Sequence, residues 1–197
     1  ISRTGRLRGA SIYYSERSLA DLDRCRRERN PHPSRIRIAG TRRVLRLFIG
    51  FETVRPTFET TGTLETKPSR VKILVCGSRF WEDKLLLSDC LSSIFLKEDV
   101  LIEGGAQGAD TLAAEWFCRT RQNPILLHFP AEWEKYGKAA GPIRNKQMID
   151  EGKPQLVIAF HDNLEISKGT GNMVKQAKKA GIFIIHFSHE KPEGVIL

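Results

Sequence analysis

Five short apolar runs, separated by stretches of helical periodicity, constrain the fold of this 197-residue chain more than any other feature. The runs are residues 73–76, 100–102, 125–127, 156–160 and 182–185. Each run is apolar throughout and does not alternate with polar residues, which is typical of a strand that is covered on both faces. We therefore expect an α/β fold with a doubly wound, mainly parallel sheet of five strands.

Helical patterns fill the intervals between the runs. Residues 83–96, 109–120, 142–151 and 170–180 place apolar side chains at helical spacing. Pro142 stands where a first helical residue is expected, and Gly181 follows the last pattern as glycines follow helix ends. Because ligands of such sheets bind beyond the carboxyl ends of the strands, the residues that follow each run are the candidate site.

The net charge of +9 belongs entirely to the first part of the chain. Residues 1–70 contain fifteen Arg and one Lys against seven acidic residues, whereas residues 71–197 contain sixteen basic and sixteen acidic residues. We therefore predict a boundary near residue 70, with an Arg-rich extension at 1–70 and the α/β domain at 71–197.

Three interpretations of residues 1–70 stay open. The segment is a poorly ordered basic tail, an arm that contacts nucleic-acid phosphates, or a presequence or translated upstream sequence. The third interpretation arises because the first methionine is Met148. We favour an inert tail or artefact, since charge runs are usually solvated, with residues 42–51 as a short strand or helix.

Composition argues against several protein classes. No apolar stretch approaches the length that crosses a bilayer, and the start does not resemble a secretory signal. The four cysteines, Cys25, Cys76, Cys90 and Cys118, are far apart, which argues against a disulfide framework or a zinc site and fits a reducing compartment. We predict a cytoplasmic protein with no metal, no cofactor and no membrane partner, and a homo-oligomer is left open.

Glycines and polar groups follow the first two runs. Gly77 permits a tight turn, Ser78 offers a hydroxyl and Arg79 offers a guanidinium for phosphate or carboxylate, although the three also fit an ordinary strand-to-helix turn. A loop with three glycines, Gly104, Gly105 and Gly108, then opens the helix that starts at Ala109 and Asp110. Amides at such a helix start can face an anion, whereas no Walker A or G-x-G-x-x-G pattern is present.

Asp110 has two interpretations. A carboxylate in the first turn stabilises a helix through its dipole, without any ligand. In a functional role it would hold a ribose hydroxyl or act as a base, because it would repel phosphate.

Basic and small residues follow the third and fourth runs. Lys138 and Arg144 flank a helix start, where cations oppose the helix dipole and a bound anion would explain them. Gly169, Thr170 and Asn172 form a second small-residue loop that opens a helix. Nearby Trp133 and Tyr136 suit stacking on a base or plain packing, and we expect His128 to be structural.

These residues together resemble the YspA-like, cpYpsA-related branch of the SLOG superfamily over about residues 71–188. The matching features are Gly77–Arg79 with Trp81, the glycine loop at 104–110, the run 129–145 with Met148, and the loop 169–173. The resemblance implies a Rossmann-like domain that senses or processes nucleotides or nucleotide-derived molecules.

The wider superfamily is similar to phosphoribohydrolases and to the DNA-processing protein A family. The phosphoribohydrolases use a Pro-Gly-Gly-x-Gly-Thr-x-x-Glu loop with a catalytic Glu, whereas this chain has Glu103 at the Pro position and Asp110 after the glycines, with Glu115 further along. Asp110 and Glu115 are therefore the candidate catalytic carboxylates of an N-glycosidic hydrolase. The DNA-processing loop is closer to residues 105–110, which keeps single-stranded nucleic acid as a third alternative, with the Arg-rich segment as its arm.

We predict binding of a nucleotide or nucleotide-derived phosphate ligand. The phosphate is expected on the amides of 104–109 and 169–171, with Arg79, Lys138 and Arg144 supplying charge and Asp110 facing the ribose. The expected ligand-binding residues are Gly77, Ser78, Arg79, Gly104, Gly105, Gly108, Ala109, Asp110, Lys138, Arg144, Asn145, Gly169, Thr170 and Asn172.

Overall fold

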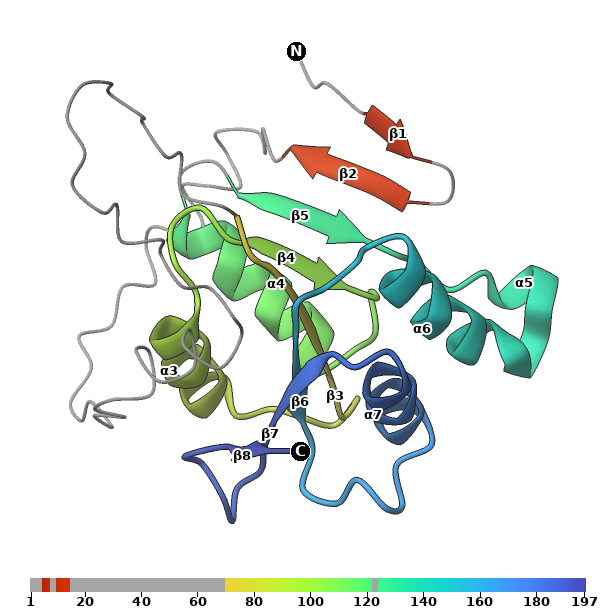
Figure 1. Ribbon diagram of the computed structural model, residues 1–197. Coiled ribbons are helices and arrows are strands. Elements are labelled where there is room, and N and C mark those ends of the chain that lie inside the picture. The colour runs from red at the N-terminus through yellow and green to blue at the C-terminus, as the bar shows by residue number, and fades with distance from the viewer. Residues whose placement is uncertain (1–4, 8–9, 15–69, 122–123) are drawn as a thin grey trace, which may run out of the picture.

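Five parallel strands form the centre of the sheet in the computed structural model, which describes residues 5–7, 10–14, 70–121 and 124–197 (Figure 1). The five are β3 (Lys72–Gly77), β4 (Val100–Glu103), β5 (Ile125–His128), β6 (Leu156–Phe160) and β7 (Phe183–Phe187). Their order is β5-β4-β3-β6-β7, so the chain winds outward from β3 in both directions. The predicted doubly wound, Rossmann-like α/β architecture is confirmed.

Antiparallel strands that the apolar runs did not predict extend both edges of the sheet. β8 (Val195–Ile196) pairs with β7, and β2 (Ala10–Tyr14) pairs with β5 and with β1 (Gly5–Leu7). The described residues therefore form an eight-stranded sheet. These strands escaped prediction because two of them have three residues or fewer and β2 has little hydrophobic patterning. The rest of the Arg-rich extension, including residues 42–51 and Cys25, lies outside the described residues.

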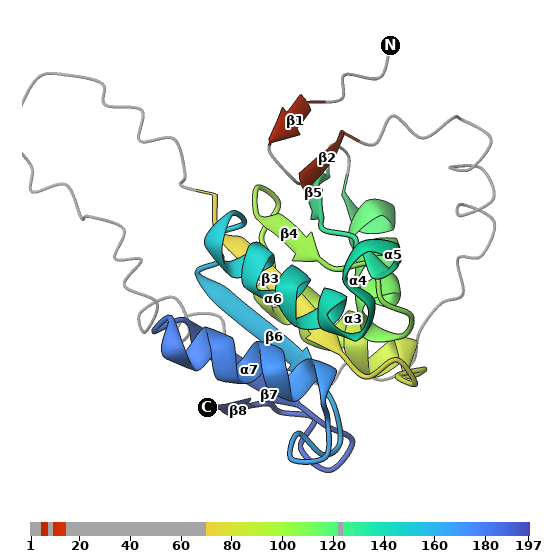
Figure 2. The same ribbon diagram turned by 90° about the vertical axis from the view of Figure 1, so that its right-hand side faces the viewer.

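Two pairs of helices cover the two faces of the parallel strands (Figure 2). α3 (Lys84–Ile94) and α4 (Ala109–Thr120) lie on one face, and α6 (Ala140–Asp150) and α7 (Gly169–Lys179) lie on the other. α6 begins two residues before Pro142, which therefore occupies its third position. The proline is tolerated there because amides of a first helical turn have no intrahelical acceptor. The helical turn α5 (Trp133–Tyr136) and the 3-10 turn η1 (Gly137–Ala139) precede α6.

Alternate residues of each strand point to opposite faces, which gives two hydrophobic cores. The core under α3 and α4 contains large aromatic side chains, among them Trp116, Phe117 and Phe160. The core under α6 and α7 contains Met148, Met173 and smaller residues such as Ala159 and Ala177. Strands that are apolar in every position, such as β6, are thus explained by burial on both faces.

The cysteines and the helix lengths bear on the predictions about disulfides and membrane spans. Cys76, Cys90 and Cys118 are free thiols. Within the described residues, no helix combines the length and apolar character that a bilayer crossing requires.

Candidate functional site

A cavity of about 570 Å³ lies beyond the carboxyl ends of the central strands β3 and β6, with α6 and α7 on its other sides. Ten of the residues predicted from the sequence line it: Gly77, Ser78, Arg79, Asp110, Lys138, Arg144, Asn145, Gly169, Thr170 and Asn172. They come from four separate strand-to-helix connections, which the winding of the sheet brings to one place. Lys168 and His161 also line this cavity.

The other predicted residues lie elsewhere. Gly104 and Gly105 line a neighbouring cavity of about 450 Å³, while Gly108 and Ala109 line neither of these two cavities. Gly108 has a positive φ of 76°, and a Cβ there would lie 2.2 Å from the carbonyl oxygen of Ser78. The absence of a side chain therefore lets the loop after β4 pack directly against the loop after β3. Glu115 is exposed on α4 and lines neither cavity, which separates it from Asp110.

Three amides of the glycine loop that we expected to hold phosphate are already engaged within the protein. The Gly104 amide donates to Oδ2 of Asp110 at 3.2 Å, and the Gly105 amide donates to Oε2 of Glu103 at 2.5 Å. The Ala109 amide donates to the carbonyl of Ser78 at 3.2 Å. The loop therefore holds its own carboxylates, which sequence reasoning missed because it did not place Glu103 against the loop.

Asp110 is buried, with 2% of its surface exposed, and it faces the guanidinium of Arg144 at 3.9 Å. Burial raises the pKa of this carboxyl to about 7, against the opposing influence of Arg144. Arg144 also donates to the carbonyl of Gly104 and, at 3.2 Å, to the side-chain oxygen of Asn145. Asp110 thus lines the cavity as a carboxyl group that gains and loses a proton near neutral pH.

Asn145 joins α6 to the start of α7. Its side-chain amide is buried and donates to the carbonyl of Gly169 at 3.3 Å and to the side chain of Asn172 at 3.1 Å. Ser167 accepts a hydrogen bond from the Thr170 amide at 3.1 Å. The amides of Gly169 and Gly171 belong to the first helical turn, where no intrahelical acceptor exists. These contacts fix the amino end of α7 against the cavity.

Exposed aromatic side chains stand at the mouth of the cavity. Phe80 is 89% exposed and Trp133 is 49% exposed, and both line the cavity. The guanidinium carbon of Arg79 lies 5.6 Å from the centre of the Trp133 ring. Large apolar side chains that remain exposed at the edge of a cavity suit a flat apolar ligand group.

A pair formed by a buried Glu and a partly exposed His, at the ends of two neighbouring strands, was missed by the sequence analysis. Glu103 ends β4 and His128 ends β5, and the two residues are partners in the parallel register. Oε1 of Glu103 lies 2.5 Å from Nδ1 of His128, and this hydrogen bond raises the pKa of the imidazole. The available signal was a Glu that closes an otherwise apolar run, beside a His that closes the next run.

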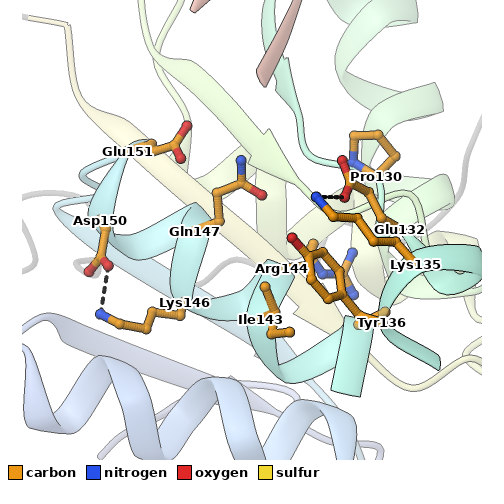
Figure 3. Close-up of a pocket in the computed structure, with 11 residues that line it drawn as sticks. Pro130, Glu132, Lys135, Tyr136, Ile143, Arg144, Lys146, Gln147, Asp150 and Glu151 are labelled. Atoms are coloured by element: carbon orange, nitrogen blue, oxygen red, sulfur yellow. Dashed lines mark hydrogen bonds and ion pairs between the residues drawn. The ribbon is translucent and has the colours of Figure 1, made fainter. Parts of the chain in front are cut away.

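Another cavity, of about 380 Å³, lies along the outer side of α6 (Figure 3). Its charged side chains compensate one another, because Lys146 pairs with Asp150 at 2.6 Å and Lys135 pairs with Glu132 at 3.5 Å. Glu151 adds a further acid to the lining. This cavity has no excess of positive charge and is a poor candidate for a phosphate ligand.

Comparisons with known proteins identify relatives of the α/β domain. The model of the YspA, cpYpsA-related SLOG family matches residues 71–136. The Gene 61 protein of Mycobacterium phage D29 is 37% identical over 128 residues, which cover 61% of this chain and 98% of that protein. No solved structure matches the chain. The chain belongs to the YspA, cpYpsA-related SLOG family, and its domain is a nucleotide-related, Rossmann-like one.

Proposed function

We propose that the 570 Å³ cavity binds a nucleotide or nucleotide-derived molecule through its phosphate. The observation that carries the proposal is the presence of four cationic side chains in the lining of this cavity. Arg79, Lys138, Arg144 and Lys168 all line this cavity, and Asp110 is the single acidic residue among its described lining residues. Since the carboxyl pKa is about 7, Asp110 does not offset these charges in full at neutral pH.

The phosphate belongs at the start of α7. The amides of the first turn carry the positive end of the helix dipole, and no acidic residue occupies that turn. Lys168 precedes the helix, and both Lys168 and Ser78 line the cavity. In the other glycine loop, the amides of Gly104 and Gly105 do not bind the phosphate, because they donate hydrogen bonds to Asp110 and Glu103.

The base belongs at the mouth, on Phe80 and Trp133. Both rings are exposed and line the same cavity as the cations. Stacking on a flat aromatic surface contributes about 1–3 kcal/mol and accepts any base. We assign Asp110, which also lines this cavity, to a ribose hydroxyl.

Isothermal titration calorimetry of the full chain with the four common nucleoside monophosphates tests the proposal. We expect saturable binding of at least one of them, weakened about tenfold by Lys138→Gln. Lys146→Gln is the matched control, because Lys146 lies on α6 outside this cavity. Absence of binding by any nucleotide, or equal loss in both variants, would contradict it.

A second candidate function is hydrolysis of the N-glycosidic bond of a nucleoside monophosphate. The observation that favours it is the carboxyl of Asp110, which lines the cavity and has a pKa of about 7. A carboxyl of this kind can donate a proton to the departing base as the N-glycosidic bond breaks, and can then take up the proton that water releases when it bonds to the ribose carbon. Chromatography of the free base after incubation tests it: release that disappears in Asp110→Asn supports hydrolysis, and intact nucleotide excludes it.

A further inference from the structure

We propose that the neighbouring 450 Å³ cavity receives the edge of the base and selects a 6-oxopurine, so that the preferred ligand is a guanine or hypoxanthine nucleotide. This inference rests on the nucleotide function proposed above. Trp133, on which the base is proposed to stack, lines this cavity as well as the larger one, whereas no described residue of α7 lines it. The smaller cavity thus adjoins the place assigned to the base and not the place assigned to the phosphate.

Two cationic side chains of this cavity have acidic partners outside its lining. His128 contacts the carboxylate of Glu103 at 2.5 Å, and Arg144 faces the carboxyl of Asp110 at 3.9 Å. Arg79, the other cation of the lining, also lines the larger cavity, where its charge is available to the phosphate. The smaller cavity therefore suits a neutral group that accepts hydrogen bonds better than it suits a further anion.

Hydrogen-bond donors prevail over acceptors in this lining. The carbonyl oxygens of Gly104, Ala106 and Ala131 line the cavity wall but already accept hydrogen bonds within the protein. No Asp or Glu lines the cavity in the described part of the chain. The side chains of Arg144 and His128, in contrast, present N–H groups. A base edge that carries acceptors therefore enters this cavity more favourably than an edge that carries an amino group.

Glu103 and Gly105 hold His128 in the lining as a donor. The hydrogen bond from Glu103 raises the pKa of the imidazole, which favours the ring form with a proton on both nitrogens. The other carboxylate oxygen accepts from the Gly105 amide, so the acid is fixed as well. Gly105 has a φ of 68°, and a Cβ there would lie 2.6 Å from Cε1 of His128. Any side chain at this position would thus displace the imidazole.

A 6-oxopurine presents the acceptors that such a lining requires. Its O6 and N7 atoms are neighbouring acceptors on one edge, whereas adenine carries an amino donor in place of O6. Gln107 is exposed and lines the smaller cavity but not the larger one, so its side-chain amide can donate to this edge. Because a carboxamide can also turn and accept from adenine, the selection against an amino group depends on His128 and Arg144.

Isothermal titration calorimetry of the full chain with GMP, IMP and AMP tests the inference. We expect GMP and IMP to bind wild-type protein with affinities within about threefold of each other, and about tenfold more tightly than AMP. Gln107→Glu places a group that only accepts hydrogen bonds in the smaller cavity, so the advantage of GMP over AMP should fall below about threefold or reverse. Gln147→Glu is the matched control, because it makes the same change on α6 outside both cavities and should preserve the advantage.

Other outcomes overturn the inference in distinguishable ways. Equal affinities for the three nucleotides, or a preference for AMP, reject it while the proposed nucleotide function stands. A preference for GMP over IMP as large as that over AMP would show that the 2-amino group is recognised, and rejects it too. An advantage that survives Gln107→Glu would place the base edge outside the smaller cavity. Failure of every common nucleotide to bind rejects the proposed function as well.

Discussion

Buried carboxylates have different surroundings at the two ends of the sheet. At the amino end, Asp99 is 4% exposed and accepts hydrogen bonds from the amides of Leu96 at 2.7 Å and Val71 at 3.3 Å. At the carboxyl end, Asp110 is equally buried but lines a cavity and faces Arg144. Two aspartates with similar burial thus have different surroundings. Asp99 accepts hydrogen bonds from the backbone, whereas Asp110 faces a cavity.

Buried polar groups also concentrate at the carboxyl end. Six polar or charged residues are buried in the described part of the chain, namely Asp99, Glu103, Asp110, Asn145, Thr170 and Ser188. Asp99 alone of these stands at the amino end, directly before β4. Because burying polar groups costs free energy, their accumulation at one end indicates a function there that stability alone does not explain.

The largest expected effect concerns the pH dependence of stability that Asp110 causes. The pKa of Asp110 is about 7 in the folded protein, above its ordinary value of 3.8. Between these values the folded state keeps a proton that the unfolded state has lost, so stability falls as pH rises from about 4 to 7. Asp110→Asn removes this loss, on the order of 4 kcal/mol at about 1.4 kcal/mol per pH unit.

Urea denaturation of wild type and Asp110→Asn across this range measures the difference. The free-energy gap between the two proteins should widen in favour of Asp110→Asn as pH rises. A gap that stays constant would show that the pKa of Asp110 is not raised in the folded protein, and would contradict the account.

The next effect is on binding. Arg144→Met removes one of the two arginines that line both the 570 Å³ and the 450 Å³ cavities, and we expect nucleotide affinity to fall about 100-fold, the loss typical of truncating a buried charge. Arg119→Met makes the same change at an exposed position near the carboxyl end of α4 and should leave affinity unaltered. Calorimetry measures both, and circular dichroism checks that each is folded. Affinity within threefold of wild type for Arg144→Met would contradict the placement of the ligand.

Asp99→Ala should lower stability and leave nucleotide binding unchanged. It leaves two backbone amides without their acceptor, and we expect a loss of about 2 kcal/mol in the free energy of unfolding. Nucleotide affinity should remain within twofold of wild type, because Asp99 is remote from the cavity lining. Reduced affinity in a folded Asp99→Ala protein would break the distinction between the two ends.

The smallest expected effect comes from the cavity mouth. Phe80→Ala removes an exposed ring that contributes little to the core, so stability should change by less than about 0.5 kcal/mol. Nucleotide affinity should drop about three- to tenfold through lost stacking. Leu85→Ala, at an exposed apolar residue of α3 outside the cavity, is the control. Unchanged affinity for Phe80→Ala would place the base elsewhere.

The sequence predicted the parts of this molecule that depend on local pattern. Continuous apolar runs located all five parallel strands, and the bounds of α4 at Ala109–Thr120 were predicted to the residue. The loops around Arg79, Arg144 and Gly169 were placed at one edge because parallel strands end together.

The parts that depend on side-chain direction could not be predicted. Whether the Gly104 amide faces a ligand or Asp110 is decided by the first turn of α4, and the pairing of Glu103 with His128 requires the register of β4 and β5. The shift of the α6 start from Pro142 to Ala140 depends on η1, whose three residues carry no periodic signal.

Nuclear magnetic resonance mapping of the full chain with a bound nucleoside monophosphate tests the central claim most directly. The account predicts that the largest amide shifts occur at Ser78, Gly169, Thr170 and Gly171, around the start of α7. Shifts centred on Leu96 and Asp99 at the amino end, or spread along the Arg-rich segment with the cavity residues unmoved, would contradict it.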